Sequence, residues 1–138
     1  MTKNDKDDQA VNKSILVVED DEFLQDMICQ KLVQQGFSIS TATDAESAKN
    51  EINRKKFDFI LLDLVLPKMG GLDFLRELKD ESSTHNNIPV MILSNLYQDD
   101  KIEEAKELGA VDFMVKSNHA PSEIVKRIVQ IFAEENKS

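Results

Sequence analysis

The sequence predicts an α/β fold, in which five parallel strands form a doubly wound sheet with five helices on both faces. Five short apolar runs alternate along the chain with segments whose apolar residues recur at helical spacing, which is typical of this class. The first run, residues 15–18, is apolar at every position, as expected of a parallel strand that is buried on both faces. Right-handed crossovers between such strands place helices on both faces of the sheet.

Strands are expected at residues 15–18, 37–40, 59–62, 88–93 and 111–115. The first and third are unbroken apolar runs, which predicts strands buried on both faces. Residues 37–40 alternate between apolar and polar side chains, so the second strand is expected nearer an edge of the sheet. Pro89 lies near the start of the fourth strand, where a proline is tolerated.

Helices are expected at residues 23–32, 45–52, 72–78, 102–108 and 121–132. In the first helix, Phe23 and Leu32 mark the ends of one apolar stripe, and Gly36 stands where a C-terminal glycine would end the helix. Residues 43–46 have the form of a capping box for the second helix. Pro121 suits the first turn of the last helix.

Length and composition fit one globular domain. The 138 residues are 41% hydrophobic and 31% charged, and polar segments at 1–12 and 136–138 are expected to be flexible tails around a domain spanning 13–135. The net charge of −9 repels phosphate backbones, so we expect no direct DNA binding. No apolar run is long enough to span a bilayer and no signal peptide is evident, so we expect no membrane insertion and a cytoplasmic location.

Polar side chains follow four of the five predicted strands. Ligands of such sheets bind outside the carboxyl ends of the strands, so these side chains are candidates for a site. They are Asp20 and Asp21 after the first strand, Asp63 after the third, Ser94 after the fourth and Lys116 after the fifth. Three converging carboxylates repel one another, and Mg²⁺ with oxygen ligands would compensate. Together with a lysine, the set suits phosphoryl transfer to a carboxylate.

Simpler interpretations of these residues stay open. Asp20 and Asp21 could stabilise a helix N-terminus, Ser94 could cap a helix, and an aromatic residue such as Phe113 is usually part of the core. A flavin-binding protein of the same topology is disfavoured, because the acidic residues 19–22 would repel a phosphate. A phosphatase with an aspartate nucleophile usually has a second acid where this chain has Val65. A docking module that is never phosphorylated is a further alternative.

Four segments in this order resemble one protein family. They are residues 15–21, 63–72, 92–94 and 113–116, which read ILVVEDD, DLVLPKMGGL, ILS and FMVK. Across residues 13–135 the chain resembles a response-regulator receiver domain of two-component signalling, such as the chemotaxis-type single-domain receivers. The resemblance implies a flavodoxin-like fold with strand order 2-1-3-4-5.

The resemblance also implies roles for individual residues. The implied phosphoacceptor is Asp63. The implied Mg²⁺ ligands are Asp20, Asp21, Asp63 and the backbone carbonyl of Val65. Lys116 and Ser94 are the implied contacts of the phosphoryl group, and Ser94 and Phe113 are the implied switch residues. Phosphorylation would change the face made by the fourth helix, fifth strand and fifth helix. The protein would then be a regulator that catalyses only its own Mg²⁺-dependent phosphorylation and dephosphorylation, rather than an enzyme.

The partners implied by the resemblance are a histidine kinase or phosphotransfer protein as phosphoryl donor and a downstream protein as the reader of the switch. In the family, the switching face often also mediates homodimers. Few residues follow position 132, so we expect either a single-domain regulator or a receiver domain excised from a longer protein.

Two departures from the family pattern lead to predictions. Receivers commonly have a proline, usually in a cis peptide, where this chain has Ser117. We expect a trans bond between Lys116 and Ser117, because a cis bond before a residue other than proline costs about 2.5–4 kcal/mol. Val65 and Leu96 stand two residues after Asp63 and Ser94, and their apolar side chains cannot hold a water, which predicts slow self-dephosphorylation.

Overall fold

The computed structural model describes residues 13–95 and 99–136. Over these residues, five parallel strands form one sheet in the order β2-β1-β3-β4-β5, which confirms the predicted fold class and strand order. The strands are β1 (Ser14–Val18), β2 (Ser38–Ala42), β3 (Phe59–Asp63), β4 (Val90–Ser94) and β5 (Asp112–Val115). The helices are α2 (Glu22–Gln34), α3 (Ala45–Arg54), α4 (Gly71–Leu78), α5 (Asp99–Glu107), the short 3-10 helix η1 (Lys116–Asn118) and α6 (Pro121–Asn136).

The predicted tails lie largely outside the described residues. Residues 1–12 and 137–138 are not described, whereas residue 136 belongs to α6. Within the described ranges, no helix has the length and apolar character needed to cross a membrane.

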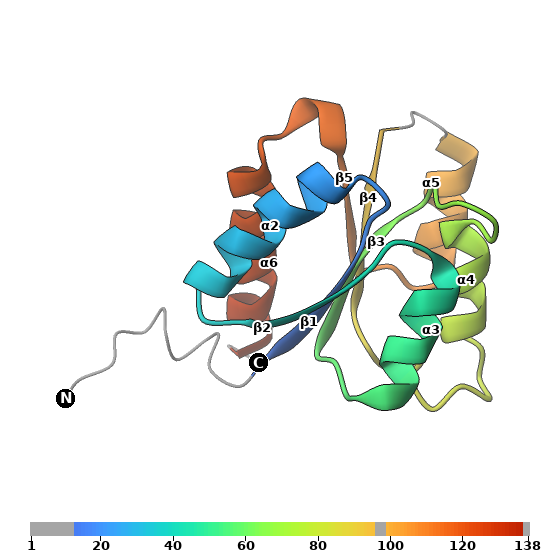
Figure 1. The fold of residues 1–138 in the computed structure, drawn as a ribbon. Helices are drawn as coiled ribbons and strands as arrows, with labels where there is room; N and C mark the ends of the chain where they lie inside the picture. Colours follow the sequence, from blue (N-terminus) through green and yellow to red (C-terminus); the bar gives the residue numbers. More distant parts are fainter. Residues whose placement is uncertain (1–12, 96–98, 137–138) are drawn as a thin grey trace.

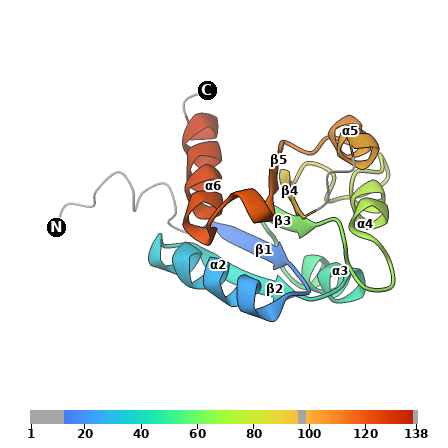
Figure 2. The ribbon, with the colours of Figure 1, turned by 90° about the horizontal axis from the view of Figure 1, so that it is seen from above.

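Helices cover both faces of the sheet, with α2 and α6 on one face and α3, α4 and α5 on the other (Figures 1 and 2). Alternate residues of each central strand pack into the two layers, so that Leu16 and Ile60 belong to the cluster with α3 and α4, and Ile15 and Phe59 to the cluster with α2 and α6. All residues of β3 and β4 are buried. Residues 15–18 of β1 are buried as well, so the unbroken apolar runs 15–18 and 59–62 are covered on both faces, as predicted.

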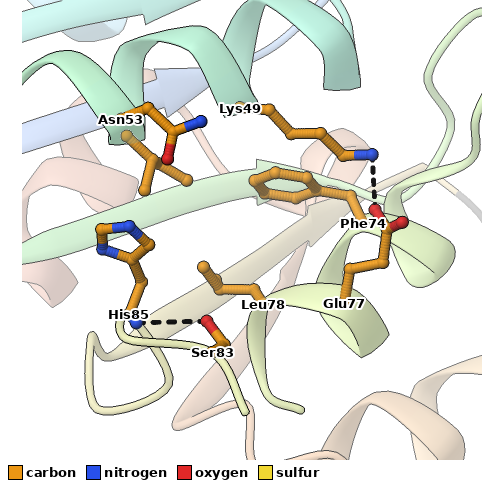
Figure 3. Close-up of a pocket in the computed structure, with 8 residues that line it drawn as sticks. Lys49, Asn53, Phe74, Glu77, Leu78, Ser83 and His85 are labelled. Atoms are coloured by element: carbon orange, nitrogen blue, oxygen red, sulfur yellow. Dashed lines mark hydrogen bonds and ion pairs between the residues drawn. The ribbon is translucent and has the colours of Figure 1, made fainter.

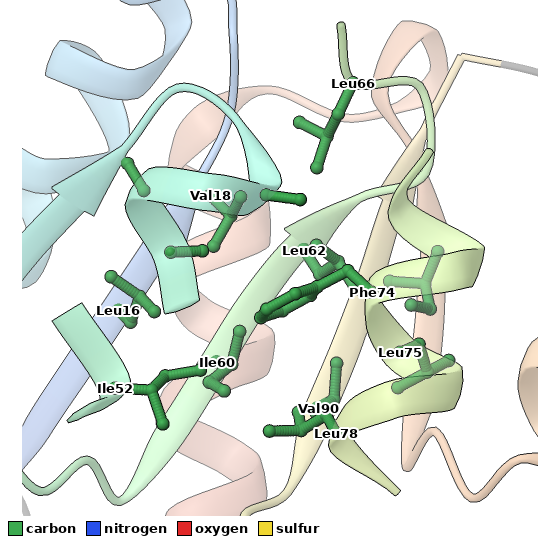
Figure 4. Close-up of a cluster of buried hydrophobic side chains, with 14 of the residues drawn as sticks. Leu16, Val18, Ile52, Ile60, Leu62, Leu66, Phe74, Leu75, Leu78 and Val90 are labelled. Atoms are coloured by element: carbon green, nitrogen blue, oxygen red, sulfur yellow. The ribbon is translucent and has the colours of Figure 1, made fainter. Parts of the chain in front are cut away.

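Aromatic side chains pack in the hydrophobic core on both faces of the sheet. On the α4 side, Phe74 points toward the β3 residues Ile60 and Leu62 (Figure 4). On the α6 side, the Phe132 ring lies with its centroid 5.1 Å from that of Phe37 and 5.5 Å from that of Phe59. This packing holds α4 and α6 against the strands whose ends carry the candidate site residues.

The structure differs from the predicted apolar stripe on α2. Phe23 is 75% exposed, although the helical spacing placed it on the buried face. The residues of α2 that are buried are Gln25, Ile28 and Leu32. This spacing defines the face that meets the sheet, and Phe23 lies two residues before Gln25, about 200° around the helix, so it points away from that face.

Several element boundaries also differ from the predicted ones by one or more residues. The N-cap of α3 is Asp44 rather than Thr43, and its Oδ1 accepts a hydrogen bond from the Ser47 backbone N–H at 2.8 Å. β2 begins at Ser38, so Phe37 packs into the core just before the strand begins. The preceding apolar residue thus mimics the start of a strand.

Candidate functional site

The carboxyl ends of β1, β3 and β5 bring two acids and a lysine into contact. Glu19 directly follows β1, Asp63 ends β3, and Lys116 directly follows β5. Lys116 Nζ lies 2.6 Å from Glu19 Oε1, as an ion pair without hydrogen-bond alignment, and 2.8 Å from Asp63 Oδ2, to which it donates a hydrogen bond. Glu19 and Asp63 are 1% and 3% exposed, so the lysine bridges two buried acids.

Backbone N–H groups fix the remaining oxygens of the two buried acids. Asp63 Oδ1 accepts a hydrogen bond from the Val65 N–H at 3.0 Å. Glu19 Oε2 accepts one from the Asp21 N–H at 3.0 Å. Each carboxylate is therefore oriented on one side by the lysine and on the other by the loop that follows its own strand.

Burial and charge act against each other at this site. Burial raises the pKa of Glu19 to about 7, against the opposing effects of the Lys116 ammonium group and the Asp21 N–H. Burial also raises the pKa of Asp63, again opposed by Lys116. Burial lowers the pKa of Lys116, but the two carboxylates outweigh it and hold that pKa above its ordinary value. One ammonium group thus leaves the acids incompletely compensated, which favours a further cation.

Three carboxylates are arranged so that a metal ion fits among them. Glu19, Asp20 and Asp63 each offer one oxygen, and these oxygens lie within 4.8 Å of one another. Hard oxygen donors of this kind suit Mg²⁺, which typically keeps several waters and takes only a few protein ligands. Asp20 is exposed, so this side of the cluster is open to solvent.

The structure places Glu19, and not Asp21, in the carboxylate cluster with Asp20 and Asp63. Asp21 is the N-cap of α2, where its Oδ1 accepts a hydrogen bond from the Leu24 N–H at 3.2 Å, and it is not in the carboxylate cluster. The simpler interpretation, a helix cap, is thus what the structure shows for Asp21. Glu19 was missed, although it is the first residue after the apolar run 15–18 and the strand-end rule points to it.

Ser94 lies on β4, next to β3, and Phe113 lies on β5, the strand beyond β4. Ser94 is fully buried at the end of β4 and pairs in register with Val115, the residue before Lys116. Phe113 of β5 is partly buried against the cluster that contains α3 and α4 residues, and Lys106 Nζ lies 5.9 Å from the centroid of its ring. Ser94 is thus next to the strand that leads to Lys116, and Phe113 lies farther back toward α5.

Two departures noted in the sequence can be placed. The bond between Lys116 and Ser117 is trans, as expected, and η1 begins there. Val65 is 48% exposed beside Asp63, to which its N–H donates. Leu96 lies outside the described residues.

A separate hollow of about 270 Å³ lies between α3 and α4 (Figure 3). Phe74 and Leu78 contribute its apolar lining, and an ion pair of 2.6 Å joins Lys49 to Glu77. None of its lining residues belongs to the carboxylate cluster or to Lys116. We therefore assign this hollow no part in the chemistry of the site.

Comparisons with known proteins agree with this geometry. Residues 15–129 match the family described as response regulator receiver domain. The chain is 40% identical over 116 residues to the phosphate regulon transcriptional regulatory protein PhoB of Escherichia coli, a match that covers 84% of this chain and 50% of PhoB. It is 36% identical over 117 residues to the sensory transduction protein RegX3 of Mycobacterium tuberculosis, with 83% of this chain and 48% of RegX3 covered.

Solved structures show the same fold. The chemotaxis response regulator CheY4 of Vibrio cholerae aligns with a TM-score of 0.76 at 26% identity, covering 87% of this chain and 98% of CheY4. By contrast, the chain spans about half the length of the curated relatives it matches.

The relatives correct one expectation. The exclusion of DNA as a direct partner, drawn from the net charge of −9, is wrong, because proteins named transcriptional regulatory proteins are among the relatives. The charge of one domain governs only the contacts of that domain. It carries no information on the other half of a relative twice as long as the matched region.

Proposed function

The chain belongs to the response regulator receiver domain family, and on that premise we propose that it is a phosphorylation-dependent signalling switch whose phosphoacceptor is Asp63. One observation carries the proposal. Asp63 ends a fully buried strand with its carboxylate held by Lys116, beside two further carboxylates that suit a divalent cation. A buried acid fixed in this way is positioned for attack on phosphorus.

The proposed donor is a phosphohistidine on a histidine kinase or phosphotransfer protein. An Asp63 carboxylate oxygen attacks phosphorus and forms the new P–O bond, while the P–N bond breaks and its electron pair leaves with the imidazole, which takes a proton from water. Lys116 then exchanges its contact with Asp63 for one with a phosphoryl oxygen. When bound by Glu19, Asp20 and Asp63, with the Val65 carbonyl as a further ligand, Mg²⁺ supplies neutralisation of the phosphoryl charge.

The proposed output is a changed surface. By analogy with hydroxyl phosphorylation, the group adds roughly −1.5 to −2 charges and new acceptor oxygens. Ser94 donates a hydrogen bond to it, and Phe113 turns inward, which repacks the face of α5, β5 and α6 that a protein partner reads. In support, Phe113 is only partly buried and pairs in register with Ile92, two residues before Ser94.

The only reaction proposed for the protein is the transfer of a phosphoryl group to Asp63 and its later hydrolysis. It catalyses only its Mg²⁺-dependent phosphorylation and dephosphorylation, in the cytoplasm, as one step of a phosphorelay.

Incubation with acetyl phosphate and Mg²⁺, followed by intact mass measurement, tests this function. We expect a gain of one phosphoryl group that hydroxylamine removes, and no gain either with EDTA or in Asp63→Asn. An equal gain in Asp63→Asn would contradict the assignment of the acceptor. Steady hydrolysis of a phosphate ester by Asp63→Asn would instead favour a phosphatase.

A further inference from the structure

We propose that Gln25 positions the acidic pair Glu19 and Asp20, and thereby sets how tightly the site binds a divalent cation. This inference rests on the proposed function, since it concerns the same site. Gln25 lies on α2, is 6% exposed, and does not touch the carboxylate oxygens of the cluster. We therefore describe it as a positioning residue.

The side-chain amide of Gln25 joins the ends of two strands. Its Nε2 donates hydrogen bonds to the carbonyl oxygens of Glu19 and Ala42, both at 3.1 Å and both buried. The Ala42 oxygen also accepts from the Glu19 N–H at 3.0 Å. Glu19 is the first residue after β1 and Ala42 the last of β2, and these two strands lie side by side in the sheet (Figure 1). One amide therefore ties the loop that carries the acids to the edge strand.

These bonds fix the whole backbone of Glu19. Its N–H is held by Ala42 and its C=O by Gln25, while its two carboxylate oxygens contact the Asp21 N–H and Lys116. The peptide unit that contains the Glu19 carbonyl also contains the Asp20 nitrogen, and a peptide unit is planar. Holding this carbonyl therefore sets the direction in which the chain enters Asp20.

Gln25 is a polar residue on a buried helix face. Gln25 shares the buried face of α2 with Ile28 and Leu32, where an apolar side chain would pack without an amide to satisfy. A buried amide is costly unless its hydrogen bonds are made, and here the Nε2 group donates to the Glu19 carbonyl on the loop and to the Ala42 carbonyl at the end of β2. The polar residue contributes anchoring of the loop that an apolar one could not provide.

Loss of the Gln25 amide is expected to lower the affinity for the cation more than it lowers the stability of the fold. In Gln25→Met the Glu19 carbonyl loses this donor, and residues 19–21 gain freedom to move out of the cluster. Removal of a group that orients the ligands of a metal ion, without contacting the ion itself, typically lowers metal affinity by about 10–100-fold. We expect the lower end, about tenfold, because Gln25 holds the backbone of Glu19 rather than its carboxylate.

A Mg²⁺ titration, followed by the NMR signals of the amides of residues 19–21, measures the effect. Gln30→Met makes the same change at an exposed position of α2, and Ile28→Val weakens the same buried face without removing a hydrogen bond. We expect the Mg²⁺ Kd to rise about tenfold in Gln25→Met and to stay within about twofold in both controls. A folded Gln25→Met with the parent Kd would overturn the inference.

Gln25→Asn keeps the test decisive even where Gln25→Met does not fold. Asparagine retains the amide but is one methylene shorter, so its N–H donors fall short of the two carbonyl oxygens and the Mg²⁺ Kd should again rise about tenfold. A folded Gln25→Asn with the parent Kd would also count against the inference. Failure of the parent chain to bind Mg²⁺ would refute the proposed function, whereas parent binding with unchanged variants would refute only the role of Gln25.

Discussion

Gly71, the first residue of α4, leaves no room for a side chain against the backbone of Asp63, the proposed phosphoacceptor. A Cβ at this position would lie 2.2 Å from the Asp63 carbonyl oxygen, 2.7 Å from Leu64 Cα and 3.1 Å from the Asp63 carbonyl carbon. Gly71 also donates its N–H to the Leu64 oxygen at 2.9 Å. In Gly71→Ala, α4 or the end of β3 must therefore move.

Two effects of Gly71→Ala have opposite signs. Alanine is the better helix former, worth up to about 1 kcal/mol in a helix interior and less at a first residue. Overpacking of a tight interior costs about 1–3 kcal/mol, and here the clashing atoms are backbone and cannot rotate away. We expect the steric effect to win, with a net loss of about 2 kcal/mol in the free energy of unfolding. At this chain length that corresponds to a fall of roughly 6 °C in Tm.

Gly70→Ala is the matched control for Gly71→Ala. Gly70 is the N-cap of α4 with φ −67°, and the nearest atom to its added Cβ is the Leu64 oxygen at 4.0 Å. Thermal and urea unfolding followed by circular dichroism should show Gly70→Ala losing less than about 1 kcal/mol. Should Gly71→Ala be as stable as Gly70→Ala, or more stable than the parent, the steric reasoning is wrong.

Three further predictions concern the metal, the cysteine and the phosphoryl lifetime. Mg²⁺ at about 100 times its Kd should stabilise the fold by about 2.7 kcal/mol and so raise its Tm. Asp20→Asn should show little of this rise. A parent Tm that does not change with Mg²⁺ would contradict the cation site. Burial and then Asp26 raise the pKa of Cys29 to about 11, so alkylation should be slow at neutral pH and accelerate toward pH 11, and fast alkylation near neutrality would contradict this. With apolar Val65 beside Asp63, the phosphorylated protein should persist for minutes or longer after donor removal, and decay within seconds would refute this.

The sheet and most of its site could be predicted because the relevant signals are local. An apolar run such as residues 59–62 predicts a buried strand by itself, and the topology then brings Asp63 and Lys116 to one edge of the sheet. Their contact joins residues far apart in sequence, yet it follows from the strand order alone. Ser94 reaches its buried position beside Val115 for the same reason.

The errors arose where several interpretations fit one segment. In the acidic run 19–22 the sequence does not distinguish a ligand from a helix cap, and only the start of α2 at Glu22 makes Asp21 the cap and leaves Glu19 facing Lys116. By spacing alone, Phe23 fits an apolar stripe on α2. The face of α2 that is buried contains the polar Gln25, and Phe23 lies outside it. Net charge, an average over the whole domain, could not exclude DNA as a partner.

Locating the phosphoryl group tests the central claim most directly. After phosphorylation with acetyl phosphate and Mg²⁺, borohydride reduction converts an aspartyl phosphate into homoserine, and peptide mass spectrometry then identifies the altered residue. We predict that the altered residue is Asp63 and no other acid of the cluster. Modification of Glu19 or Asp20 instead, or a stable phosphate on Ser94, would contradict the account.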